Sequence, residues 1–196
     1  MNDGIIGITV TLCALGVLVP LLLTHATHRM QQIEDAWRKL AERHRLRFQP
    51  GRKLQVMGSL AGRAFSLASE GSGNKATFTM ELELHGPLPQ GLRLKGIGKP
   101  KDAHEAAGAP VISVHERSGR IDINGAVRVG ARHPGELTDY LDLARQRAAL
   151  RLIDVAGKLQ SRTLSVPFTS HPDDLEGLDH ALQELAAVAP VLEQNR

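Results

Sequence analysis

Hydrophobic and polar residues follow three different patterns along this chain. An uncharged run from Ile5 to Leu23 comes first, and a helical pattern with apolar residues three and four apart follows to about residue 47. Stretches with a period of two then occupy the middle, and two helical patterns with a strand between them come last. Strands first and helices later favour an α+β fold, in which a mostly antiparallel sheet carries two C-terminal helices on one face.

The uncharged run predicts a transmembrane helix. Its nineteen residues would span about 28 Å, which is close to the hydrocarbon thickness of a bilayer. The alternative is a cleaved signal peptide, but the first four residues carry no Lys or Arg and the run is too long for one. We therefore expect an uncleaved anchor with these apolar side chains: Ile5, Ile8, Leu12, Leu15, Leu18 and Leu22.

The charges beside the run predict its orientation. No Lys or Arg precedes it, whereas several follow within about 25 residues, and such flanking cations mark the cytoplasmic side. We therefore expect a single-pass protein of the inner (cytoplasmic) membrane, with its N-terminus outside and its C-terminal domain in the cytoplasm.

The helical pattern from Thr27 to about Arg47 predicts a basic juxtamembrane helix. Its apolar stripe contains Met30, Ile33, Trp37 and Leu40. The stripe has two interpretations: a coiled-coil seam with a partner helix, or an intramolecular seam against the chain's own domain. Barely two heptads are available, which is short for a coiled coil, so we favour the intramolecular seam.

The middle of the chain predicts an antiparallel sheet. The segment from Lys75 to His85 alternates strictly, which is typical of a strand with one buried face. The pair Asn124-Gly125 predicts a tight turn. Shorter apolar stretches predict further strands at 54–57, 64–67, 92–97, 111–115 and 126–129.

Two helices are predicted near the C-terminus. The first begins at Pro134 and ends at Gly157, and the second begins near Ser170 with acids in its first turn. A strand at 162–168 separates them.

No motif passes the test for a catalytic or cofactor site. Gly96-Ile97-Gly98-Lys99-Pro100 lacks the residues that a phosphate-binding loop requires, and Ser59 stands one place too early for a nucleophile elbow. The only cysteine, Cys13, lies in the uncharged run, and the nine histidines match no metal-ligand spacing. We predict no cofactor and no metal.

Charge is distributed unevenly along the chain. The net charge is only +3 and six residues are aromatic, which argues against nucleic acid as a partner. Residues 24–63 carry nine Lys or Arg and three acids, whereas 170–196 carry six acids and one Arg. The basic segment would lie beside the anionic inner leaflet, with lipid contacts expected from Arg29, Arg38, Lys39 and Arg43.

Short motifs give the chain a family resemblance. At Trp37, Leu40-Ala41, Phe48, Pro50-Gly51 and Gly62-Arg63 it resembles uncharacterised, single-pass, N-terminally anchored bacterial membrane proteins. The resemblance spans most of the chain and implies a small α+β domain that ends in helix, strand and helix. The stretch from Lys99 to Pro110 departs from it, and the resemblance implies no reaction.

Together these patterns predict four segments: a tail at 1–4, a transmembrane helix at 5–23, a basic juxtamembrane helix at 24–48 and a soluble α+β domain at 49–196. We expect a scaffold or accessory domain that binds a protein partner or self-associates at the membrane. A sensor of small molecules or lipid head groups is the alternative, and an enzyme of unrecognised type is the second alternative.

Overall fold

The computed structural model describes residues 28–51, 53–70, 77–97, 112–115, 120–133, 135–168 and 172–194. The expected anchor from Ile5 to Leu23 and the tail before it lie outside these residues. Among the described helices, none combines the length and the apolar character that crossing a bilayer requires.

The described strands form one ten-stranded sheet in which each neighbouring pair is antiparallel. Its spatial order is β1-β2-β3-β4-β10-β9-β5-β8-β7-β6. The strands are β1 Arg47–Gln49, β2 Gln55–Leu60, β3 Arg63–Glu70, β4 Thr77–Glu83, β5 Arg93–Gly96, β6 Ile112–His115, β7 Arg120–Ile123, β8 Val127–Gly130, β9 Lys158–Gln160 and β10 Thr163–Phe168.

A hairpin of the last two strands in the sequence, β9 and β10, joins two groups of strands. Strands β1 to β4 form one meander, and β5 to β8 form the other group. The β9–β10 hairpin lies between them, because β10 pairs with β4 and β9 pairs with β5. Residues 158–168 therefore make the two groups one sheet.

Strand register places apolar side chains in rows on one face of the sheet. One row runs through Phe65, Leu82, Leu164, Leu159 and Leu94 and continues across β8 and β7. These five side chains are at most 3% exposed. Since side chains alternate between faces along a strand, the residues between them point to the other face.

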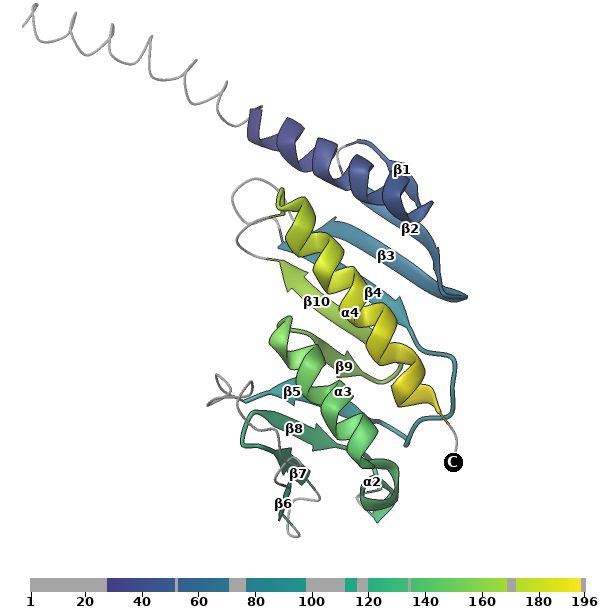
Figure 1. Ribbon diagram of the computed structural model, residues 1–196, viewed down its shortest axis with the longest axis vertical. Coiled ribbons are helices and arrows are strands. Elements are labelled where there is room, and N and C mark those ends of the chain that lie inside the picture. The colour runs from purple at the N-terminus through teal and green to yellow at the C-terminus, as the bar shows by residue number, and fades with distance from the viewer. Residues whose placement is uncertain are drawn as a thin grey trace, which may run out of the picture.

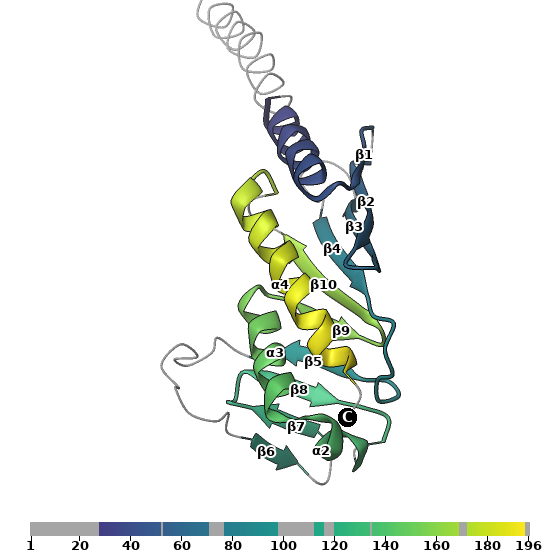
Figure 2. The same cartoon turned by 45° about the vertical axis from the view of Figure 1, so that its right-hand side comes forward.

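Helices cover the apolar face (Figure 1). The N-terminal helix, described at residues 28–44, lies over β1 to β3; α4 (Leu175–Glu193) lies over the centre; and α3 (Leu143–Asp154), preceded by α2 (Gly135–Tyr140), lies over β9, β5 and β8. Figure 2 shows the helices as a layer on one side of the strands. The predicted α+β fold with an antiparallel sheet is confirmed at this level.

Several predicted elements have different bounds. The predicted helix from Pro134 to Gly157 is wrong as one element, because Asp142 adopts an extended conformation and its carboxylate accepts a hydrogen bond from Arg145 N, which begins α3 separately. The Asn124-Gly125 turn is confirmed, with φ values of 50° and 62° that suit these two residues. Strands β1, β7 and β9 were not predicted.

The N-terminal helix belongs to the same core as the sheet. Its buried residues and those of α2, α3, α4 and every strand from β2 to β10 except β6 form one continuous cluster. The segment predicted at 24–48 thus contributes a helix that packs on the domain and, from Arg47, the edge strand β1. Residues 24–27 lie outside the described part.

Candidate functional site

The predicted apolar stripe of the N-terminal helix faces the domain. Ile33 is 2% exposed and Trp37 and Leu40 are fully buried, whereas Met30 is 50% exposed. The Trp37 ring meets Phe78 of β4 edge to face at 5.7 Å, and its Nε1 donates to Pro172 O at 2.9 Å. Three of the four stripe residues therefore join the helix to the sheet and to the start of α4.

The four cations predicted to contact lipid differ in their described contacts. Arg38 pairs with Glu34 at 2.9 Å and lies over the Phe48 ring, while Arg43 pairs with Asp179 of α4 at 2.7 Å. Arg29 and Lys39 are exposed. Arg43 thus makes an intramolecular contact, and Arg29 and Lys39 face solvent.

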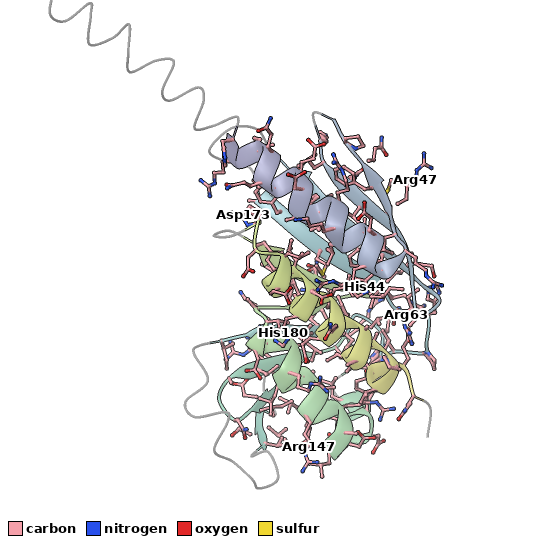
Figure 3. The ribbon with its side chains drawn as sticks, turned by 45° about the horizontal axis from the view of Figure 1, so that its top comes forward. His44, Arg47, Arg63, Arg147, Asp173 and His180 are labelled. Carbon is pink, nitrogen blue, oxygen red and sulfur yellow. The ribbon has the colours of Figure 1, made fainter. Side chains whose placement is uncertain are left out.

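Asp179 joins the N-terminal helix to α4. Its side chain is 9% exposed; His44 Nε2 lies 2.5 Å from its Oδ1, and Arg43 Nη1 and Gln183 Nε2 donate to its Oδ2. Burial raises the pKa of Asp179, but hydrogen bonds and charge from His44 and Arg43 lower it by more, so this pKa lies below its usual value. Figure 3 shows His44 where the two helices lie side by side.

Glu193 fixes the other end of α4 to the sheet. Its carboxylate accepts hydrogen bonds from the Arg63 guanidinium of β3 and from His85 N at 2.5 Å. Burial raises the pKa of Glu193, but these hydrogen bonds and the Arg63 charge lower it by more. The backbone approaches closely here, since a Cβ on Gly86 would lie 2.5 Å from Glu193 Cβ.

Two residues beside the α2–α3 break bind the last carbonyls of α4. Tyr140 OH donates to Leu192 O at 2.8 Å, and the buried Arg145 guanidinium donates to Gln194 O and lies 4.6 Å from the centre of the Tyr140 ring. A cation at the C-terminal end of a helix opposes the helix dipole favourably. Helix α4 is therefore held at both ends by polar contacts.

These polar clusters join the helices to one another and to the sheet. His44 and Asp179 resemble two members of a catalytic triad, but within the described residues His44 hydrogen-bonds only to Asp179 and meets no nucleophile. The described part of the chain holds no group of three His, Cys, Asp or Glu side chains arranged for a metal ion. Exposed charged side chains lie instead on the face of the sheet opposite the helices.

The face of the sheet opposite the helices is the candidate functional site, and we call it the open face. No described helix covers it (Figure 2). Its register forms two rows: Glu81, Ser165 and Lys158, with Lys95, Arg128 and Asp122 beyond; and Glu83, Thr163, Gln160, Arg93, Gly130 and Arg120. Exposed charged side chains thus lie on β4, β9, β5 and β7 of this face.

Charge divides the open face into two regions. Glu81 and Glu83 of β4 are exposed acids. Beyond β10, four exposed cations stand on the three strands β9, β5 and β7, and we call this group the cationic strip: Arg93, Lys95, Arg120 and Lys158. Arg128 lies among them but pairs with Asp122 through two hydrogen bonds of 3.0 and 3.2 Å.

Sequence reasoning missed the cationic strip. The alternation of cation and apolar residue in Arg93-Leu94-Lys95 was its one local signal, since such alternation marks a strand with one charged face. The strip itself depends on the strand order β9-β5-β8-β7, which no local pattern specifies.

Comparison with known proteins adds little. No family model matches the chain, and no curated protein is similar to it in sequence. Among solved structures, the crystal structure of the mycobacterial trehalose monomycolate transport factor A, TtfA, matches 84% of this chain and 98% of that chain, with a TM-score of 0.47 and 10% sequence identity. The function must be argued from this chain's own geometry.

Proposed function

We propose that this chain is a non-catalytic accessory domain that binds a protein partner through the open face of its sheet. The observation that carries the proposal is the contrast between the two faces: helices fill one, while the other presents charged side chains on exposed strands. An antiparallel sheet can leave one face in water, but a face that gathers four unpaired cations within its described residues suits recognition of an anion.

The proposal includes the predicted location. The uncharged run from Ile5 to Leu23 would hold the domain at the inner membrane as a single-pass anchor, with the domain in the cytoplasm. The N-terminal helix packs on the sheet through Trp37 and Leu40, so its described residues, which begin at 28, belong to the core of the domain.

The interior gives less support to a sensor of small molecules. The apolar residues between sheet and helices form one continuous cluster. Among buried side chains in the described residues, the one polar atom without a partner is Arg145 Nε. A pocket that selects a polar ligand needs several convergent polar groups, so the open face is the stronger candidate.

Site-specific photo-crosslinking in cells tests the proposal. A photoreactive residue would replace Ser59, Glu81 or Gln160 on the open face, or the exposed His180 or Arg147 on the helical layer (Figure 3). We expect discrete adducts of one size from the open face and none from the helical layer. Equal labelling from both layers, or adducts from the helical layer alone, would show that the open face is not the binding surface.

A further inference from the structure

We infer that the cationic strip binds an acidic protein segment in extended conformation, with one carboxylate seated over Gly130 between Arg93 and Arg120. This inference rests on the proposed function and names the chemistry of the partner. It follows from three features of the open face: a gap in its side chains, the spacing of its cations and the acids that limit it.

The gap lies at Gly130. Register places Gly130 of β8 directly between Arg93 of β5 and Arg120 of β7. A Cβ built on Gly130 would meet no atom within 4 Å, so the space above this backbone is open. Neighbouring strands lie about 4.8 Å apart, which puts the two arginines about 10 Å apart across the glycine. Two flexible guanidinium groups flanking a bare backbone can close on one carboxylate from both sides.

The spacing of the cations fits an extended chain. Arg93 and Lys95 are two residues apart on β5, which is about 6.8 Å. Carboxylates on alternate residues of an extended segment have the same repeat. Lys158 lies on the adjacent strand β9 and continues the positive charge toward the centre of the sheet. A segment with acids at alternate positions could therefore pair with successive cations.

Acids beside the strip favour a narrow partner over a membrane surface. Glu81 and Glu83 lie on β4, two strands from Lys158 and three from β5, which is about 10 to 14 Å. A flat anionic bilayer laid on the strip would also lie against these acids, because they belong to the same face of the sheet and would repel it. The strip also lies near the opposite edge of the sheet from the N-terminal helix (Figure 1), away from the side that leads to the expected anchor.

The test measures peptide binding to the full chain in phosphatidylcholine nanodiscs by fluorescence anisotropy. One labelled probe alternates Glu and Ser over ten residues; its isomer has the same composition with all Glu in one block. We expect the alternating peptide to bind more tightly than the block isomer, and its affinity to fall steeply when NaCl is raised from about 50 to about 300 mM.

Two charge-matched variants separate the strip from net charge. The strip variant R93Q/K95Q/R120Q/K158Q should weaken binding of the alternating peptide by about tenfold or more, since several exposed ion pairs are lost together. The control variant R29Q/K39Q/K53Q/R147Q removes as many exposed cations from outside the strip and should change affinity by less than about twofold.

Variants at Gly130 test the seat itself. Gly130→Glu places a carboxylate of the chain between Arg93 and Arg120 and should weaken peptide binding about as much as loss of both arginines. Gly130→Thr suits a strand and fills the gap without charge, so it should weaken binding less, with unchanged thermal stability. Full affinity in Gly130→Glu with a folded protein would overturn the seat.

Each remaining outcome of these experiments also supports or overturns the inference. Equal weakening by the strip and control variants, or no binding of either peptide, would overturn the inference. So would strip-dependent binding to phosphatidylglycerol vesicles or strip-dependent self-association, which would assign the strip to lipid or to a second copy. If crosslinks from the open face persist unchanged in the strip variant, this inference fails while the proposed function stands; if they never form, the proposed function fails.

Discussion

The two faces of the sheet are built from the same strands, but one consists of buried apolar side chains and the other mainly of exposed polar ones. On the helical face, Leu82 of β4 is fully buried in the core cluster. On the open face, its neighbours Glu81 and Glu83 are exposed. Alternate residues of one strand thus serve two purposes: one set specifies the fold, and the other is free to specify a partner.

This separation implies that stability and binding can be changed independently. A substitution on the helical face should lower the free energy of unfolding, and one on the open face should leave it nearly unchanged. Trp37 is the only tryptophan in the chain and is fully buried, so its fluorescence reports unfolding of the full chain in mild detergent.

The largest expected contrast lies within β4. Leu82→Ala should lower the free energy of unfolding by about 2–5 kcal/mol, because it opens a cavity in a packed row. Glu83→Ala, one residue away, should change it by less than about 0.5 kcal/mol. Urea unfolding followed by Trp37 fluorescence measures both. Similar losses from the two substitutions would break the distinction between the faces.

The next effect tests polar contacts within the helical layer. Asp179→Asn should cost about 1.5–3 kcal/mol of unfolding free energy, because His44 and Arg43 would lose a charged acceptor. Glu176 contacts Arg43 at 3.4 Å and its side chain is 80% exposed, so Glu176→Gln is the matched control and should cost less than about 0.5 kcal/mol. A large loss of unfolding free energy in Glu176→Gln would mean that Glu176, and not Asp179, makes the stabilising contact with Arg43.

Acid should weaken the same layer. The pKa values of Asp179 and Glu193 are lowered in the folded chain, so their contribution to stability is complete above their unfolded pKa values of about 4. It is lost as pH falls through the lower folded values. Urea midpoints between pH 3 and 7 should drop at the acid end, and the D179N/E193Q double variant should show a flatter profile. A drop centred near pH 6 would point to other groups.

A smaller effect is expected where α4 ends. Tyr140→Phe removes the hydroxyl that donates to Leu192 O and should cost about 0.5–1.5 kcal/mol of unfolding free energy. Thr138→Ala, at an exposed position of α2, serves as control. Thermal unfolding measured by circular dichroism would show whether the hydroxyl contributes; equal melting temperatures for both variants would remove it from the set of stabilising contacts.

The smallest effect is expected on the open face. The E81Q/E83Q variant should change unfolding free energy by less than about 0.5 kcal/mol. It should tighten binding of the alternating acidic peptide by about twofold, since it removes two negative charges near the cationic strip. The same anisotropy titration measures it. Weaker binding would mean that these acids contact the peptide directly.

The sequence predicted local features of the fold and missed its long-range ones. The strict alternation from Lys75 to His85 identified β4 and its buried side, and the Trp37 stripe identified the buried side of the N-terminal helix. Strands β1 and β9, with three residues each, are too short for a pattern. The break at Asp142 was missed because apolar residues continue across it at helical spacing.

The candidate site was less predictable than the fold. Arg93, Arg120 and Lys158 lie on strands far apart in the sequence, and they are brought together by the pairings of β9 with β5, of β5 with β8 and of β8 with β7. The residues around Gly130 in the sequence give no sign of its proposed role. That role depends on Arg93 and Arg120, which the neighbouring strands place on either side of it. A site whose residues come from several strands cannot be predicted from one sequence when the order of those strands in the sheet is unknown.

The β9–β10 hairpin also determines when the sheet can be completed during synthesis of the chain. A ribosome that has reached about residue 155 has produced β1 to β8 but not the strands that pair with β4 and complete β5. Unpaired strand edges bind other chains readily, so each half-sheet is at risk until residues 158–168 emerge. The sheet can therefore be completed only after residues 158–168 have emerged, and nascent chains paused before the hairpin should depend on chaperones.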